Sequence, residues 1–187
     1  MKTDNDNTKE ILPEEHLLPD KWSLYFHFVC DVSSYKLSYI HIMDVESCEK
    51  WAQMIKFVPG FQLVLRPNTK LIIYGREVNS FSFFKNDIMP EWEHQANHHG
   101  FTITTRLKLP QTETEHLWTF ITCECARGAM NESVLGVQIT KKLSRHLILV
   151  KVDFWLSHSS NITNIQSEIN ILCKQWGFDL QIANRNL

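Results

Sequence analysis

The sequence has 187 residues, 43% of them hydrophobic, and a net charge of −2 at pH 7. This length suits one folded domain, and the balance of apolar and charged residues excludes a wholly disordered chain. The near-neutral charge excludes a general attraction for long nucleic acid, so any nucleic-acid ligand should be short or held at one local site.

The N-terminal residues are polar, and we predict a disordered tail over 1–15 followed by a single folded domain over 16–187. The first ten residues are too polar for a signal peptide, and no apolar run approaches the length of a membrane span. We therefore expect the protein to lie in the cytoplasm or the nucleus.

The first half of the domain alternates apolar and polar residues over 21–30 and 35–44, which predicts two strands. Residues 45–58 change to helical spacing, and Asp44 is the predicted cap of this helix. Residues 62–80 hold two apolar runs around a Pro-Asn-Thr-Lys step, which indicates either a small hairpin or an ordered insertion near 60–80.

The second half is predicted to contain more strands, two helices and a loop. The predicted strands are 80–85, 101–109, 133–142, 145–154 and 178–184, with a tight turn around Leu143-Ser144. One helix, 112–129, begins with the capping pattern Thr112-x-x-Glu115, and the other, 161–177, lies between Asn161 and Gly177. Residues 89–100 have no period and are predicted to form a loop or a short helical turn.

These connections are too short and hairpin-like for a doubly wound parallel sheet. The pattern predicts an α+β fold with a single curved antiparallel sheet of about eight strands and three helices on its convex face. The helices leave the concave face of the sheet free, which makes it the expected place for a ligand.

Cysteines and histidines give no strong metal signal. The five cysteines are scattered, and the Cys-x-Cys at 123 and 125 has the wrong spacing for a zinc knuckle. His94 and His98 have the i,i+4 spacing of a helical metal site, but no second half of such a site is visible. We expect no metal and no cofactor.

The six tryptophans include one in an unusual place. Trp22, Trp118 and Trp176 lie in strand or helix patterns and are predicted core residues. Trp92 lies outside any periodic element, between two glutamates, in the stretch SFFKNDIMPEWE at 82–93. This position favours a ligand-binding ring over a core residue.

Several stretches resemble, in order, landmarks of the cap-binding translation initiation factor 4E family. The resemblance spans roughly 16–184, and its most specific part is 82–93, with a turn after Phe-Lys followed by Pro-x-Trp-Glu. Other parts are HLLPDKWSLYF at 16–26, the helix bearing Trp118, and GVQITKK at 136–142. The resemblance implies a curved antiparallel sheet backed by three helices and a binding function without catalysis.

The family's ligand is the 7-methylguanosine cap of messenger RNA. The resemblance implies that Trp92 stacks on the base, that Glu93 accepts hydrogen bonds from the guanine edge, and that Tyr35 supplies the second ring. Methylation gives the base a positive charge, so a cation–π attraction adds to stacking. Most family members carry tryptophan at the position of Tyr35, and some divergent members, including a repressor-type homologue, carry tyrosine.

The resemblance also implies cations for the cap phosphates. Lys142 and Arg145 take the positions of the family's arginine and lysine, in a register uncertain by one residue, and Lys142 shares a strand face with Thr140 and Gln138. The family has a further tryptophan near the methyl group on the next strand. Because the matching stretch LILVKV at 147–152 has no ring, we expect this contact to be absent or replaced.

The family carries a second site on its convex face, where a partner helix with the pattern Tyr-x-x-x-x-Leu-apolar docks. Trp51 matches the family's docking tryptophan, although packing within the helix is an open alternative for it. His16, Leu17 and Thr119 fall on the same surface by resemblance. The implied partner is a scaffold initiation factor of the 4G type or a 4E-binding protein. Thr119 and Phe120 replace an apolar residue and an acid of the family, which puts the usual partner contacts in doubt.

Three functions are therefore in competition. The first is a cap-binding protein that takes part in translation initiation or its regulation. The second is a family member impaired in cap binding that acts as a translational repressor or adaptor through its partner surface. The third, from another class, is a small nucleotide enzyme that uses His94, His98 and His99 as metal ligands or base. We expect the protein to be no enzyme, since no nucleophile–base pair or P-loop is present.

Overall fold

The fold is built on an eight-stranded antiparallel sheet. The computed structural model describes residues 15–29, 38–58, 69–144, 147–158, 161–178 and 182–185. The strands lie in the order β2-β1-β4-β6-β7-β5-β8, and β3 pairs with β4 outside this path. The bounds are β1 Leu17–Phe28, β2 Tyr39–Ser47, β3 Leu71–Ile73, β4 Arg76–Lys85, β5 Phe101–Leu107, β6 Val134–Ser144, β7 Leu147–Leu156 and β8 Ile182–Arg185.

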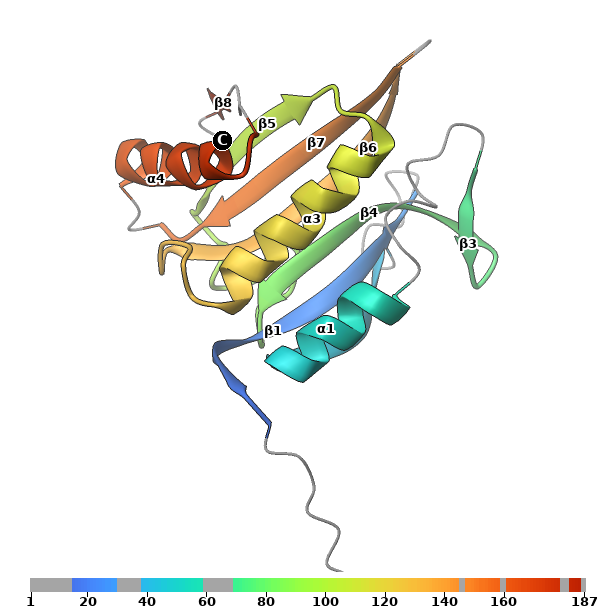
Figure 1. The fold of residues 1–187 in the computed structure, drawn as a ribbon, viewed down its shortest axis with the longest axis horizontal. Helices are drawn as coiled ribbons and strands as arrows, with labels where there is room; N and C mark the ends of the chain where they lie inside the picture. The colour runs from blue at the N-terminus through green and yellow to red at the C-terminus, as the bar shows by residue number, and fades with distance from the viewer. Residues whose placement is uncertain are drawn as a thin grey trace, which may run out of the picture.

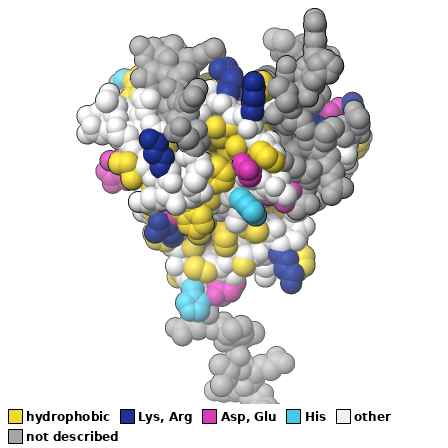
Figure 2. Space-filling model, turned by 45° about the horizontal axis from the view of Figure 1, so that its top comes forward, with side chains coloured by type: hydrophobic (Ala, Val, Ile, Leu, Met, Phe, Trp, Pro, Cys, Tyr) yellow, Lys and Arg dark blue, Asp and Glu magenta, His cyan; other side chains and the backbone are white. Residues whose placement is uncertain are grey.

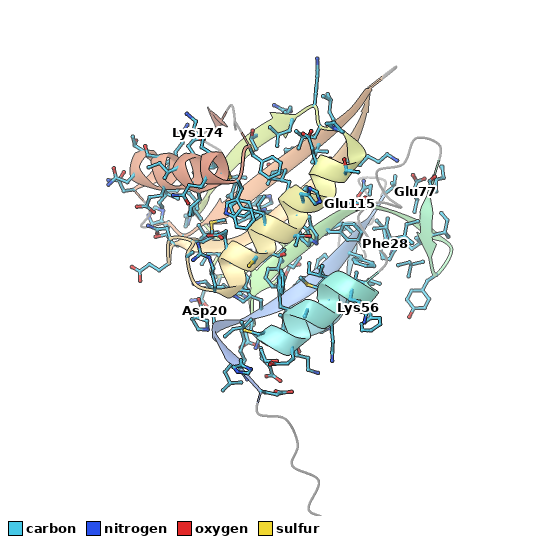
Figure 3. The ribbon with its side chains drawn as sticks, in the orientation of Figure 1. Asp20, Phe28, Lys56, Glu77, Glu115 and Lys174 are labelled. Carbon is cyan, nitrogen blue, oxygen red and sulfur yellow. The ribbon has the colours of Figure 1, made fainter. Side chains whose placement is uncertain are left out.

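Three helices lie across one face of the sheet, as Figure 1 shows. They are α1 Cys48–Phe57, α3 Gln111–Ala126 and α4 Ile162–Gln175. Charged side chains come from all three helices, and Figure 3 labels Lys56 on α1, Glu115 on α3 and Lys174 on α4. The predicted α+β fold, a single antiparallel sheet with three helices on one face, is confirmed.

The core lies between the helices and this face of the sheet. The alternation along β1 sends Trp22, Leu24 and Phe26 toward the helices, where each is about 1% exposed. Trp22 stacks on Phe83 of β4 with ring centroids 5.0 Å apart. Burying side chains of this size stabilises the fold by roughly 1.5–3 kcal/mol each before the loss of conformational entropy. The period of two in the sequence therefore decides which face of the sheet carries the helices.

The helix ends match the predictions at α4 only. Asn161 Oδ1 accepts from the Asn164 amide at 3.3 Å, and Gly177 has a φ of 83° just past the last turn. Ser47, rather than the predicted Asp44, caps α1 by accepting from the Lys50 amide at 3.2 Å. The predicted capping box of α3 is wrong, because Pro110 occupies the cap position and makes no side-chain cap bond.

One predicted turn lies elsewhere, and another lies partly outside the described residues. Ser144 pairs with Leu147, so the link from β6 to β7 is 145–146 and not Leu143-Ser144. β3 and β4 form a hairpin that turns at Tyr74 and Gly75, with φ of 51° and 73°. Residues 67 and 68 of the Pro-Asn-Thr-Lys step lie outside the described residues, so the choice between a hairpin and an insertion there stays open.

Some predictions lie outside the described residues. They are the disordered tail, apart from Glu15, and the part of the proposed insertion that falls at 60–68. In the parts of the chain that the structure describes, no helix combines the length and apolar character that crossing a membrane requires.

Candidate functional site

The Trp92 loop, residues 86–100 between β4 and β5, is held by hydrogen bonds from the Asn97 side chain and the Asn86 amide. Asn97 is 1% exposed, and its Nδ2 donates to the carbonyl oxygens of Met89 at 2.8 Å and Glu91 at 2.7 Å. The Asn86 amide donates to Lys21 O of β1 at 2.7 Å, which ties the start of the loop to the sheet. Trp92 is therefore carried by a defined turn, as the absence of period in this stretch predicts.

Trp92 stacks on a second tryptophan, Trp155 of β7. The ring centroids are 3.9 Å apart and the rings are inclined by 22°. Trp155 is 5% exposed and meets the edge of Phe84 at 5.4 Å. A Cβ on Gly136, which pairs with Trp155 across β6 and β7, would lie 2.4 Å from the Phe84 ring. Glycine at this position therefore makes room for the aromatic cluster behind Trp92.

The ring contact that was expected to be absent or replaced has a candidate replacement on the strand that follows the basic turn. That strand, β7, brings Trp155 against Trp92, only three residues beyond the stretch 147–152 in which a ring was sought. Residues 151, 153 and 155 alternate onto the sheet face opposite the helices, whereas 150, 152 and 154 enter the core. Following this alternation to the end of the strand would have found Trp155.

Glu93 and its neighbour Glu91 lie in different surroundings. Glu93 is exposed and makes no hydrogen bond to another described residue. Glu91 is half-buried and accepts from the Tyr39 hydroxyl at 3.0 Å, which joins the Trp92 loop to β2. The two carboxylates thus differ in availability, since Glu91 is used within the fold and Glu93 faces solvent.

The other three predicted cap-site residues lie wholly or partly outside the described residues. Tyr35 and Arg145 are among the positions that the structure does not describe. Lys142 belongs to β6, where its backbone pairs with Leu149, but its side chain is outside the description. Their predicted roles as second ring and phosphate ligands stay predictions.

The concave face of the sheet, opposite the helices, carries buried polar side chains. Gln138 Nε2 donates to Ser80 Oγ at 2.9 Å, and Ser80 Oγ lies 2.8 Å from Thr140 Oγ1. His27 is 8% exposed, with Nε2 2.7 Å from Ser82 Oγ, and burial lowers the pKa of this histidine to about 4. At neutral pH its imidazole is therefore uncharged.

A buried acid lies on the same face near Trp155. Asp153 is 4% exposed and accepts from Thr104 Oγ1 at 2.7 Å. Its other carboxylate oxygen is 2.6 Å from Lys151 Nζ, so the negative charge is paired. The described floor of the concave face is polar but holds no unpaired buried charge.

A hollow of about 500 Å³ lies beside Trp92. It is lined by Trp92, Asn97, Phe101 and three histidines, His98, His99 and His158. His158 Nδ1 donates to the His99 carbonyl at 2.8 Å. No group of three or more histidine, cysteine, aspartate or glutamate side chains within the described residues could hold a metal ion. The structure thus gives no support to a metal role for His94, His98 and His99.

A second hollow, here called the helical groove, lies on the opposite, helix-bearing face. Its volume is about 500 Å³, and it is lined by Trp51, Glu113, His116, Thr119, Phe120, Cys123, Trp176, Gly177 and Phe178. Figure 2 shows hydrophobic side chains gathered in the middle of this side of the molecule, with acidic and histidine side chains beside them. Trp51 Nε1 donates to Thr122 Oγ1 at 3.3 Å, which orients the ring. Trp51 and Thr119 therefore line the same groove, and their predicted role in binding a partner stays a prediction.

His16 and Leu17 lie beside α1 but do not line the groove. His16 Nδ1 is 2.7 Å from Glu49 Oε1, and the Cys48 amide donates to His16 O at 2.8 Å. The bond from His16 lowers the pKa of the Glu49 carboxyl to about 2. Leu17 is 76% exposed. This segment presents an apolar side chain at the start of α1, while the groove lies along α3.

The prediction for Trp176 is wrong. Trp22 and Trp118 are core residues as predicted, at 1% and 9% exposed, but Trp176 is 57% exposed. The residue caps the end of α4, one position beyond the last helical residue, so the apolar stripe of the helix does not extend to it. The sequence signal for its position was Gly177, which ends the helix directly after it.

Comparisons with known proteins agree with the geometry. The family model described as eukaryotic initiation factor 4E matches residues 17–184. No curated protein matches the chain significantly.

Several solved structures have a similar fold. A structure of Ascaris suum eIF4E-3 with an m2,2,7G cap has a TM-score of 0.69 at 13% identity, covering 92% of this chain and 93% of that one. A schistosome eIF4E complexed with m7GpppA and 4E-BP has a TM-score of 0.69 at 16% identity, covering 91% and 88%. A complex of C. elegans eIF4E-3 with the 4E-binding protein Mextli and a cap analog has a TM-score of 0.69 at 13% identity, covering 91% and 93%. At these identities the likeness establishes the fold.

Proposed function

The chain belongs to the eukaryotic initiation factor 4E family, and from that membership we propose that it binds the 7-methylguanosine cap of messenger RNA. It thereby takes part in translation initiation or its regulation, as a binding protein and not as an enzyme. The observation that carries the proposal is the Trp92-Glu93 pair, in which a ring fixed against Trp155 stands next to an exposed carboxylate.

The chemistry of the cap suits these two side chains. A base stacked on an aromatic ring gains about 1–3 kcal/mol, and the positive charge of the methylated base adds about 0.5–2 kcal/mol. The Glu93 carboxylate accepts hydrogen bonds from the guanine N1–H and exocyclic amine, which adenine does not offer in this arrangement. Tyr35 is the proposed second ring, and Lys142 and Arg145 are the proposed phosphate ligands.

Trp155 strengthens the case for Trp92 as a stacking platform. It covers one face of the Trp92 indole, and in this proposal the base stacks on the other face. A ring that is already held in place loses little side-chain entropy when a ligand stacks on it. In this proposal Trp155 is a positioning residue that acts through Trp92.

The opposite face is the proposed partner site. Trp51 and Thr119 in the helical groove, together with His16 and Leu17 at the start of α1, would dock a helix with the pattern Tyr-x-x-x-x-Leu-apolar. The partner is a scaffold factor of the 4G type or a 4E-binding protein. The schistosome and C. elegans structures hold a 4E-BP and Mextli, respectively. Such a role is consistent with a place in the cytoplasm or nucleus.

One observation favours a second candidate, an adaptor or repressor that does not bind the cap. The stacking contact between Trp92 and Trp155, at 3.9 Å between ring centroids, already covers one face of the Trp92 ring. If the base needs that same face, cap binding requires the two rings to separate, which costs the stacking energy of about 0.5–1.5 kcal/mol. This candidate keeps the partner site and loses the cap site.

Retention on m7GTP-agarose distinguishes the two functions. The wild-type protein is expected to stay on the resin through a wash with GTP and to elute with free m7GTP. Trp92→Ala and Glu93→Gln should each pass through the column, because one removes the stacking ring and the other the charged acceptor.

The matched control is Trp176→Ala, which removes an exposed tryptophan from the opposite face and should be retained like the wild type. A wild-type protein that passes through the resin while still binding a Tyr-x-x-x-x-Leu-apolar peptide would establish the adaptor instead.

A further inference from the structure

The starting observation is Trp176, an indole that stands 57% exposed at the end of α4. Its position is fixed by the backbone that ends the helix. The Gly177 amide donates to Lys174 O at 3.0 Å and the Phe178 amide to Cys173 O at 2.9 Å, the pair of bonds of a Schellman motif. Gly177 adopts the required φ of 83°. The exposed ring therefore stands on a defined helix end.

The turn directs two aromatic rings toward α3. The Trp176 ring centroid is 4.7 Å from that of Phe120, with the planes inclined by 35°. Phe178 lies 6.4 Å from the same Phe120 ring on centroids and is itself 8% exposed. Phe120 is 2% exposed and forms the base of this group. One end of the helical groove is thus an aromatic pocket with an open indole as its wall.

An open indole in a groove is a common mark of a binding anchor. Tryptophan is enriched among the side chains that dominate binding energy, because it buries a large apolar area in one rigid unit. The groove volume of about 500 Å³ lies within the range of ligand pockets, about 300–1,000 Å³. Trp51 lines the same groove, so the aromatic pocket is continuous with the surface proposed for the partner helix.

The charged side chains at the rim of the helical groove indicate which charge the bound partner carries. Glu113 and His116 of α3 line the groove, and both are exposed. Among the described residues that line it, there is no lysine or arginine. An acidic side chain beside an apolar floor favours an amphipathic helix with a lysine or arginine next to its apolar residues.

We propose that Phe120, Trp176 and Phe178 form a second anchor pocket that takes a bulky apolar side chain of the partner helix docked on Trp51. The occupant is an amphipathic helix of another protein, with leucine, methionine, phenylalanine or tryptophan at the anchor position and a basic residue near Glu113. This pocket selects among partners that share the Tyr-x-x-x-x-Leu-apolar pattern, and it rests on the proposed partner function of the Trp51 surface.

The test uses three fluorescein-labelled synthetic peptides and fluorescence anisotropy. One peptide carries Tyr-x-x-x-x-Leu-Leu alone, and the other two extend it by two helical turns, at one end or the other, with a tryptophan and an arginine. One extended peptide is expected to bind the wild-type protein at least about tenfold more tightly than the short one, the gain of one good anchor.

Variants separate the two anchors. Trp176→Ala should remove the gain of the extended peptide and leave the affinity for the short peptide unchanged, and Trp176→Phe should restore part of the gain. Trp51→Ala should weaken all three peptides. Ile171→Ala removes another exposed apolar residue of α4 that does not line the groove, and it should change nothing.

The outcomes are distinct. A short peptide that binds through Trp51, with no gain from either extension, overturns the second anchor and leaves the proposed partner function standing. A protein that binds none of the peptides overturns both. A wild-type chain that sediments as a dimer and a Trp176→Ala chain that sediments as a monomer would assign the pocket to a second copy and overturn the proposal. If an extended peptide gains affinity only after residues 1–14 are deleted, the pocket would be assigned to the N-terminal segment of the same chain. That result would also overturn the proposal.

Discussion

At the scale of single residues, Trp92, Trp155 and Trp176 show what sequence reasoning finds and what it misses. Trp92 was found because it breaks the pattern, with a Pro-Glu step before it and no period around it. Trp155 obeys the pattern of a strand, so nothing in its neighbourhood marks it as a site residue. Trp176 follows a helix, and its exposure depends on where α4 ends and on which neighbours the turn meets. Local sequence marks the helix end through Gly177, but it does not contain the neighbours that the turn meets.

His27 gives a prediction for the pH dependence of stability. Burial lowers its pKa from 6.5 to about 4, so between these values the unfolded chain binds more protons than the folded one. The free energy of unfolding should therefore fall as the pH drops from about 6.5 to 4. Above pH 6.5 His27 is neutral in both the folded and the unfolded chain, so it adds no pH dependence there. Urea unfolding at pH 7.5 and pH 4.5 should show a loss of roughly 2–3 kcal/mol from this group.

The control for His27 is His27→Gln, which keeps a hydrogen-bonding group for Ser82 but does not titrate in this range. Its loss of stability between the two pH values should be smaller than that of the wild type by the same 2–3 kcal/mol. Equal losses in both proteins would contradict a neutral, buried His27.

At the scale of the elements, the prediction from sequence was best where period and burial agree. The alternation of β1 and the apolar stripe of α4, with Ile165, Ile169 and Cys173 buried, were sufficient to assign both elements. Helix starts were less predictable, because Asp44 and Ser47 are both good caps and the sheet register decides between them. The hairpin at Tyr74-Gly75 was missed because tyrosine is a rare residue for a left-handed turn position.

Gly136 provides a test of the packing between β4, β6 and β7. Gly136→Ala would place a methyl group 2.4 Å from the Phe84 ring, so we expect a loss of about 1–3 kcal/mol in the free energy of unfolding. Phe84→Leu alone should also destabilise, since the ring is fully buried.

The double variant of Gly136→Ala and Phe84→Leu should lose less than the sum of the two single losses, because leucine leaves room for the methyl group. Urea unfolding of all four proteins completes this cycle. Additive losses would show that the two side chains do not compete for the same space.

At the scale of the whole molecule, the fold separates two candidate surfaces by the thickness of the sheet and its helices. Trp92 is carried by a loop at the concave face, and Trp51 by a helix on the other side. The fold class and this division followed from the pattern and the family resemblance together. The details of each surface did not, because Tyr35 and Arg145 fall outside the described residues and Trp176 owes its place to tertiary contacts.

This separation predicts independent surfaces. Trp51→Ala should abolish binding of a Tyr-x-x-x-x-Leu-apolar peptide and leave retention on m7GTP-agarose unchanged, whereas Trp92→Ala should do the reverse. Peptide anisotropy and resin retention of the same two preparations check this pattern. Loss of both activities in either variant would indicate a misfolded protein or a coupled pair of sites, and circular dichroism with urea unfolding tells these apart.

The most direct measurement of the central claim is a tryptophan-fluorescence titration of the wild-type protein with m7GTP and, separately, with GTP. The account predicts saturable quenching by m7GTP, with GTP weaker by about 2- to 30-fold, the factor that a cation–π term of about 0.5–2 kcal/mol supplies. Trp92→Ala should lose the quenching by m7GTP. No quenching in the wild type, or equal affinity for the two nucleotides, would contradict recognition of the methylated base by Trp92.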